Sequence, residues 1–220
     1  GRCTPDELAE ARRWWDAQGI TERPGLTRLI FVGSHISGFD LTPVRDAAIA
    51  ARDRGWPVEF ILAGDGPVSA DWRALLAGLP AVKFPGWIDL PRIQTLAERS
   101  QGAMAPYRNI ENFTRNMPNK VVDSLKLGLP LLSSLSGEVD AMIRAHGIGF
   151  SYAPDSGRTF TQAVDALIRD PAASQQMGAR AKALYDERFS FERVYGGIVR
   201  HLEGLAEGAA GVPRGVAGGR

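Results

Sequence analysis

Cysteine and histidine are scarce in this sequence, and each shortage excludes a class of protein. Cys3 is the single cysteine among 220 residues, which excludes a disulfide framework and any metal site built from several cysteines. The histidines His35, His146 and His201 stand far apart and lack the spacing of a zinc-binding motif. We therefore expect no metal site.

Net charge and long apolar runs are also lacking. Lysine and arginine together number 26 and aspartate and glutamate 25, which gives a formal net charge of +1. A dedicated nucleic-acid-binding protein normally carries a basic excess, so we expect no nucleic-acid partner. No apolar run approaches the roughly 20 residues that span a bilayer, and the first residues show no signal-peptide pattern. With 44% hydrophobic and 23% charged residues, the composition is that of a globular protein with one large domain or two small ones.

The apolar residues that are present form short runs, and these alternate with helical patterns. The predicted strands cover residues 28–32, 58–63, 81–84, 102–105, 129–133 and 148–152. The predicted helices cover residues 4–18, 41–54, 69–77, 91–100, 119–127, 138–145, 158–169, 171–186 and 191–205. Several strands are continuous apolar runs, as expected of strands that are buried on both faces. The alternation predicts an α/β fold with a doubly wound, parallel, six-stranded, Rossmann-like sheet.

Ligands of such sheets bind beyond the carboxyl ends of the strands, so the loops that follow the strands are candidate sites. The loop at residues 33–38 is rich in small residues, whose backbone amides can approach a phosphate at the start of the next helix. It is not a Walker A loop, because Phe39 stands where the lysine would follow. The loop that begins at Gly64 lacks the third glycine of a dinucleotide fingerprint, since Ser69 occupies that position. A tight turn between strand and helix explains each loop equally well.

The helix predicted at residues 119–127 begins with an Asn–Lys pair and is followed by Gly128-Leu129-Pro130. Asp123 lies one turn after Asn119, so the two side chains share a face. Such a helix start would hold a diphosphate, with Lys120 adding positive charge and Asp123 accepting hydrogen bonds from ribose hydroxyls. An ordinary helix start, with a capping Asn119, a solvated Lys120 and a first-turn Asp123, explains the same residues.

Six segments, read in order, carry a resemblance to a known family: LIFVGS, FILAGDGP, VKFPGWID, PNKVVDSLKLGLPLL, SGEVDAMIRAHGIGF and ERFSFERVY. The chain resembles the C-terminal, nucleotide-sugar-binding half of a GT-B glycosyltransferase of the family 4 type, also described as glycosyl transferases group 1. The resemblance extends over about residues 28–205. Its most specific pieces are the strand that ends in Gly-Asp-Gly-Pro and the helix that ends in Gly-x-Pro.

The resemblance implies a hexosyltransferase that transfers sugar from UDP- or GDP-sugar to a glycan or lipid-linked acceptor, as in polysaccharide biosynthesis, without requiring a metal. The chain would supply the donor-binding domain, with Asp123 holding the ribose and the turn at 86–88 contacting the base through its backbone. The resemblance identifies no catalytic residue in this chain and leaves the stereochemical outcome open. The implied donor-binding residues are Gly33, Ser34, His35, Gly64, Gly86, Trp87, Ile88, Arg115, Asn119, Lys120 and Asp123.

Several positions depart from the pattern of the family. Ser34 and Ser37 replace an arginine and a lysine that normally neutralise the leaving diphosphate, Arg115 replaces a glutamate, and Asp123 is shorter than the usual glutamate. Either the phosphates are held differently or activity is weak or lost. The candidate replacement cations are Arg108, Arg115, Lys120 and a protonated His35.

The resemblance also divides the chain into four parts. Residues 1–27 would form a linker helix and connector, 28–188 the donor-binding domain, 189–206 a helix that crosses back onto the other half, and 207–220 a flexible tail. A GT-B enzyme needs a second, N-terminal domain for the acceptor, so we expect this chain alone to be inactive in transfer. That partner domain would cover apolar patches at Trp14, Trp15 and Tyr195. The implied location is cytoplasmic, with peripheral contact to the inner face of the membrane through the partner domain.

Three other functions fit parts of the same pattern. A non-catalytic nucleotide-sugar-binding module or partner subunit is favoured by Ser34 and Ser37. A nucleotide-sugar epimerase shares the architecture, but the loops show no convincing set of acid and base residues. A nicotinamide-binding domain is disfavoured by the incomplete glycine fingerprint. We expect Trp56 and Trp72 to pack in the core, whereas Trp87 fits a packing position and a cleft position equally well.

Overall fold

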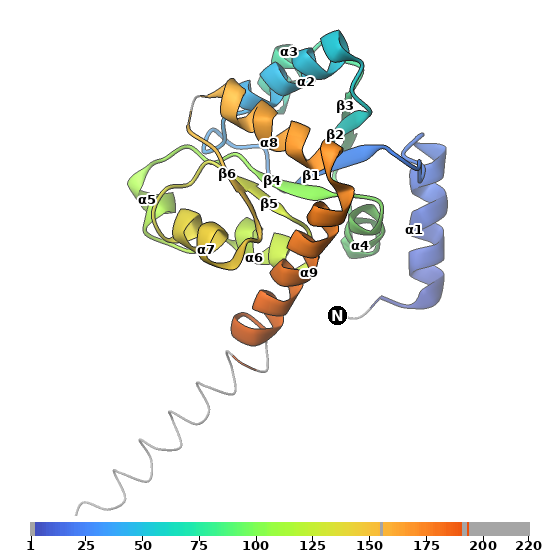
Figure 1. Cartoon of the computed structure of the whole chain (residues 1–220). Coiled ribbons are helices and arrows are strands. Elements are labelled where there is room, and N and C mark those ends of the chain that lie inside the picture. Colours follow the sequence, from blue (N-terminus) through green and yellow to red (C-terminus); the bar gives the residue numbers. More distant parts are fainter. Residues whose placement is uncertain (1–2, 155, 191–192, 194–220) are drawn as a thin grey trace, which may run out of the picture.

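The computed structural model describes residues 3–154, 156–190 and 193. A parallel sheet of six strands runs through its centre, and helices cover both faces (Figure 1). The strands are β1 (Thr27–Val32), β2 (Val58–Ala63), β3 (Val82–Gly86), β4 (Gly102–Ala105), β5 (Leu131–Ser133) and β6 (Gly149–Ser151). The helices are α1 (Pro5–Ala17), α2 (Thr42–Arg54), α3 (Ser69–Leu75), α4 (Leu90–Glu98), α5 (Glu111–Thr114), α6 (Asn119–Lys126), α7 (Glu138–His146), α8 (Gly157–Arg169) and α9 (Pro171–Arg188). These elements confirm the predicted α/β fold with its doubly wound sheet.

The strand order is β3-β2-β1-β4-β5-β6, so the chain winds outward in both directions from the centre of the sheet. β1 pairs with β2 over its whole length, from Thr27 opposite Val58 to Val32 opposite Ala63. On its other edge β1 pairs with β4, where Leu29 lies opposite Gly102. The reversal of winding between β1 and β4 is the topological switch point of the fold.

Two helical layers bury the sheet. In the view of Figure 1, α2, α3 and α8 lie on one face, and α4, α6 and α7 lie on the other. Right-handed crossovers explain this division, because the two halves wind in opposite directions. The side chains of β1 and β2 are almost all buried, which explains why these strands read as continuous apolar runs.

Two details of the fold differ from the sequence-based prediction. β3 extends to Gly86 and includes Pro85, whereas the predicted strand ends at residue 84. β3 lies at the edge of the sheet and its pairing with β2 shifts register between Ile61 and Ala63, so a proline without an amide donor is tolerated there. The short helix α5 lies within the loop at 106–118, where no element is predicted.

Helix α1 corrects the expectation that Trp15 belongs to an apolar patch for another domain. α1 packs against α4, and Trp15 is fully buried with its indole N–H donating to the Arg92 carbonyl at 3.0 Å. The Arg92 guanidinium stacks over the Trp14 ring at 4.5 Å. A salt bridge between Arg99 and Asp16, at 2.7 Å, adds a polar contact between the two helices. Trp15 therefore belongs to a packed contact within this chain, whereas Trp14 contacts Arg92 and stays partly exposed.

Other predictions fall outside the described residues. All of the helix predicted at 191–205 except residue 193 lies there, as do the tail at 207–220, Tyr195 and most of the crossover segment at 189–206. No helix in the described part of the chain has the length and apolarity needed to cross a membrane.

Candidate functional site

A groove lies at the topological switch point, over β1 and β4 and beyond the ends of β1 and β2. One cavity of about 160 Å³ lies between α4 and α6, above Ile30 of β1 and Ala103 of β4. A second cavity of about 390 Å³ lies among the loops that follow β1, β2 and β3. Val32, Leu90 and Ile93 line both cavities, so the two are adjacent, and we refer to them together as the groove. This is the position at which an open α/β sheet binds its ligands.

Most of the expected donor-binding residues line this groove. Lys120 and Asp123 line the cavity between the helices. The cavity among the loops is lined by Gly33, Ser34, Gly64, Trp87 and Ile88. The structure thus brings together residues that come from four separate segments of the sequence.

The loops after β1 and β2 approach each other so closely that glycine is required. Gly33 has a φ of 143° and Gly64 a φ of 134°, which side chains rarely permit. A side chain at Gly64 would overlap the carbonyl oxygen of Gly33, and one at Gly33 would overlap the ammonium of Lys120. The backbone therefore forms this wall of the groove, as contact with a phosphate or a base requires.

Lys120 is not the solvated charge of an ordinary helix start. Its Nζ donates a hydrogen bond to the carbonyl oxygen of Val32 at 2.6 Å and lies 4.8 Å from the centre of the Phe31 ring. Burial lowers the pKa of the Lys120 ammonium, although Asp123 acts in the opposite direction. No salt bridge to Lys120 occurs among the described residues. A partly buried cation without a paired carboxylate favours an anionic ligand.

Asp123 lies on the same face of α6 as Lys120, one turn further along. Its side chain is exposed where it lines the groove, so it is accessible to a ligand. Partial burial raises the pKa of the Asp123 carboxyl, whereas Lys120 and Lys126 lower it. Beside these residues, burial raises the pKa of the Tyr107 hydroxyl to about 12, and this hydroxyl makes a hydrogen bond with the backbone of Lys120. The carboxylate of Asp123 is placed to accept hydrogen bonds from ligand hydroxyls.

The start of α6 also differs from an ordinary capped helix. Pro118 occupies the N-cap position and supplies no side-chain cap, so the contact of the first turn with the Tyr107 hydroxyl comes from outside the helix. Asn119 is the first helical residue and is exposed, so it is not the cap that the sequence allows. The positive end of the α6 dipole therefore remains available to an anion.

His35 does not face the groove, which corrects its place among the expected donor-binding residues. Its ring is fully buried and packs on Trp72, with the ring centroids 4.3 Å apart. Nδ1 lies 2.8 Å from Ser69 Oγ, which in turn donates to Asp65 at 2.6 Å. Burial lowers the pKa of the imidazole, so a protonated His35 does not supply the missing positive charge. Its side chain joins the loops that follow β1 and β2.

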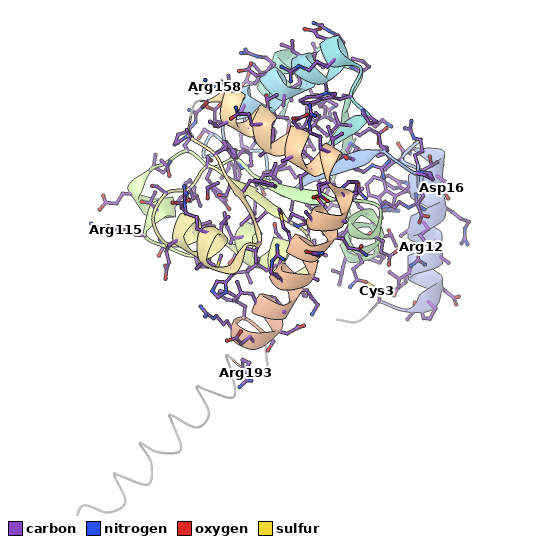
Figure 2. All side chains as sticks on the ribbon, in the orientation of Figure 1. Cys3, Arg12, Asp16, Arg115, Arg158 and Arg193 are labelled. Carbon is purple, nitrogen blue, oxygen red and sulfur yellow. The ribbon has the colours of Figure 1, made fainter. Side chains whose placement is uncertain are left out.

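The expected arginines also lie outside the groove. Arg115 forms a salt bridge with Glu111 at 3.0 Å on the surface of α5, and Figure 2 shows its side chain extending away from the domain. Arg108 donates from Nε to the carbonyl oxygen of Ser37 at 3.1 Å and lines neither cavity of the groove. Of the four candidate replacement cations, Lys120 is the one that lines the groove.

Gly86, another expected donor-binding residue, has a φ of 83° and ends β3 directly before Trp87, which lines the cavity among the loops.

Sequence reasoning missed several residues of the groove. Leu90, Ile93 and Gln94 of α4 line one wall, and Lys126 lies on α6. Leu90 and Ile93 have the helical spacing of core residues, so no local signal separates a groove wall from a buried face.

Comparison with known proteins identifies relatives of this fold. The family described as glycosyl transferases group 1 matches residues 27–170. No curated protein sequence matches the chain. Among solved structures, Anabaena Alr3699/HepE in complex with UDP and glucose matches with a TM-score of 0.71 and 16% identity, covering 92% of this chain and 53% of that chain.

Two further structures share the fold. WaaG, a glycosyltransferase involved in lipopolysaccharide biosynthesis, matches with a TM-score of 0.66 and 14% identity, covering 89% of this chain and 50% of that chain. The catalytic domain of cholesterol-alpha-glucosyltransferase from Helicobacter pylori matches with a TM-score of 0.60 and 12% identity, covering 73% of this chain and 98% of that domain. The chain thus spans about half the length of the WaaG and HepE structures.

Proposed function

We propose that this chain, which belongs to the glycosyl transferases group 1 family, binds a nucleoside-diphosphate sugar as the donor-binding domain of a glycosyltransferase. The observation that carries this proposal is the groove at the switch point, where Lys120 and Asp123 face a wall of glycine backbone. The structures of HepE with UDP and with UDP-glucose support a nucleotide sugar as the ligand of this fold.

Each part of such a donor has a chemical counterpart in the groove. The Asp123 carboxylate accepts hydrogen bonds from the ribose hydroxyls. The Lys120 ammonium, the start of α6 and the backbone around Gly33 attract the diphosphate. The turn at 86–88 contacts the base. The donor then lies across the carboxyl ends of the strands, with its sugar toward the loop that contains α5.

Diphosphate binding in this chain depends on fewer cations than the family pattern implies. Ser34 and Ser37 replace two cationic positions, and Lys120 is the replacement cation that lines the groove. Charge stabilisation of a leaving diphosphate is a large contribution to catalysis. This observation favours a second candidate function, a nucleotide-sugar-binding module without activity of its own.

Transfer requires an acceptor site, which we propose is supplied by a second domain or subunit. The chain spans about half of the WaaG and HepE structures, which is consistent with such a division. We further propose that the acceptor is a glycan or lipid-linked molecule, that the transferred group is a hexose, and that no metal is needed. Contact with the cytoplasmic face of a membrane would come from the acceptor-binding part.

A calorimetric titration tests the proposal directly. The purified chain is titrated with UDP, GDP and NAD and with UDP-glucose and GDP-mannose. We expect binding of at least one nucleoside diphosphate or its sugar conjugate, and no binding of NAD. Tight binding of NAD without a response to UDP or GDP would overturn the proposed function.

A further inference from the structure

The connector between α1 and β1, residues 18–26, is bound to the domain along its backbone. The carbonyl oxygens of three successive connector residues each accept a hydrogen bond from a cation of the domain: Gly19 from Lys83 at 2.9 Å, Ile20 from Arg99 at 2.7 Å and Thr21 from Arg28 at 2.9 Å. The three cations come from β3, the end of α4 and β1. A freely moving linker would leave its backbone to water, so these contacts fix the connector on the domain.

One carboxylate holds these cations in place. Glu59, near the start of β2, lies 2.8 Å from Arg28 and 3.0 Å from Lys83, and it also pairs with Arg23 of the connector itself. Burial acts to raise the pKa of the Glu59 carboxyl, but hydrogen bonds from Lys83 and Arg28 outweigh it and the pKa is lowered, so Glu59 stays ionised. Arg28 is 1% exposed, and in the described part of the chain Glu59 is the only carboxylate that pairs with it. Loss of the Glu59 charge would leave a buried guanidinium unpaired, which is strongly unfavourable.

Helix α1 joins this bound connector to the wall of the groove. Trp15 of α1 and Ile20 of the connector are buried in one apolar cluster with Leu96 and Ala97 of α4. Ile93, also on α4, packs against this cluster and lines the groove. Figure 1 shows α1 beside α4, and α1 itself lines neither cavity of the groove. One side of α4 therefore contacts α1, and another side faces the groove.

We propose that α1 and the connector form a strap that opens from the domain as one unit, and that its docking is coupled to ligand binding in the groove. The strap supports α4, so a ligand that contacts α4 favours the docked state, and the docked state favours the ligand by the same factor. The ionised Glu59 is the positioning residue that keeps the strap docked. The docking of the strap depends on this chain alone, whereas the coupling rests on the proposed function.

Hydrogen exchange measured by mass spectrometry tests the strap without any ligand. The variant Glu59→Gln keeps the shape of the side chain and removes its charge. We expect the amides of α1 and the connector to exchange about 10- to 150-fold faster than in the wild type, because hydrogen bonds to a charged group are lost. The amides of α8, which packs on α2 and lines neither cavity of the groove, exchange as before.

Glu98→Gln is the matched control for this comparison. Glu98 is an exposed carboxylate of α4 that pairs with Arg12 of α1 at 2.8 Å, so the variant removes one charge from the same contact between helices. We expect little change in the exchange of α1, because an exposed salt bridge contributes little to stability.

A milder variant keeps the test decisive if Glu59→Gln does not fold. Lys83→Met removes the donor to the Gly19 carbonyl and one contact of Glu59, and its side chain is 29% exposed, so the sheet is expected to fold. We expect the same pattern with a smaller increase in exchange. If exchange in the variants that fold increases no more in α1 than in α8, the strap is wrong.

Exchange in the presence of UDP tests the coupling. In Glu59→Gln, or in Lys83→Met if only that variant folds, α1 opens more often than the core of the domain. We expect saturating UDP to slow the exchange of α1 and the connector by about 5- to 150-fold, the usual range of coupling between sites, and to leave α8 unchanged. GDP takes the place of UDP if it is the nucleotide that binds.

The outcomes separate the coupling from the proposed function. If the wild type binds neither UDP nor GDP, the proposed function fails and the coupling fails with it, while exchange in the variants without ligand still decides whether the strap exists. If the nucleotide binds but leaves the exchange of α1 unchanged, the coupling alone is wrong. Equal protection of α1 and α8 indicates general stabilisation of the domain and also contradicts the coupling.

Discussion

At the scale of single residues, Lys120 and Asp123 show how one helix start acquires two different chemical properties. Both lie on the groove side of α6, yet Lys120 turns inward to the carbonyl of Val32 and Asp123 remains exposed. The inward position explains why burial lowers the pKa of Lys120. The exposed carboxylate is the group that a ligand hydroxyl can reach.

Replacement of Asp123 tests its contact with the ribose. We expect Asp123→Ala to weaken binding of a nucleoside diphosphate by about 1–3 kcal/mol, because hydrogen bonds to a charged acceptor are lost. Calorimetry measures the change. The matched control is Asp140→Ala, which removes an acid from the first turn of α7, outside the groove. Unchanged affinity in Asp123→Ala would remove this residue from the site.

At the scale of elements, two loops are held together by the buried His35. The imidazole links the loop after β1 to Ser69 at the start of α3 and packs on Trp72. The groove wall formed by Gly33 and Gly64 depends on the relative position of these same loops. We therefore expect protonation of His35 to disturb the relative position of these two loops.

The pH dependence of stability follows from the sign of the shift at His35. Burial lowers the pKa of His35 from its ordinary value of 6.5, and only Asp65 opposes this effect. The unfolded chain then binds more protons than the folded chain, so stability is full above about pH 6.5 and is lost as the pH falls through the folded pKa. Urea unfolding at pH 7.5 and 5.5 measures the loss.

The variant His35→Gln provides the comparison for this pH effect. We expect it to be less stable than the wild type at pH 7.5 and to lose less free energy of unfolding between the two pH values. His146→Gln removes an imidazole from the end of α7 and controls for the general effect of losing a histidine. Equal losses in the wild type and His35→Gln would contradict the assignment.

The contact between helices α1 and α4 is a second feature at the scale of elements. Trp15 is fully buried in it, whereas Trp14 is only partly covered by Arg92. Trp15→Ala should lower the free energy of unfolding by about 3–5 kcal/mol, as for other buried aromatic residues, and Trp14→Ala should lower it less. Urea denaturation tests both variants. A cost below about 1 kcal/mol for Trp15→Ala would show that α1 is not packed on the domain.

At the scale of the whole molecule, the proposed function gives this chain the donor side of a reaction site. We expect the purified chain to bind a donor nucleotide and to form no glycoside when offered UDP- or GDP-sugars with a mixture of glycan acceptors. Mass spectrometry of the products measures transfer, and binding in the presence of EDTA measures any need for a metal. Turnover by the chain alone would refute the division of the site, and loss of binding in EDTA would refute metal independence.

Much of the groove could be predicted because the relevant signals are local. Glycines after a strand, such as Gly33 and Gly64, mark close approach of the backbone, and Lys120 and Asp123 lie at the start of one helix. The apolar wall from Leu90 to Gln94 could not be predicted in this way. Its spacing is that of any helix face that packs against a sheet, and only the position of α6 leaves it open.

The sequence by itself determined the fold class, because apolar runs of strand length that alternate with helical patterns can be buried only in a parallel sheet with helices on both faces. It also determined the family, through the order of its segments. Only the tertiary structure decided which side chains reach the groove. His35 follows the end of β1 and Lys120 lies at the start of α6, but His35 is buried against Ser69 and Trp72, which are distant in sequence. Trp87 finds no such partner, so its indole remains open. The direction of a loop side chain depends on packing between segments, and that information is absent from local patterns.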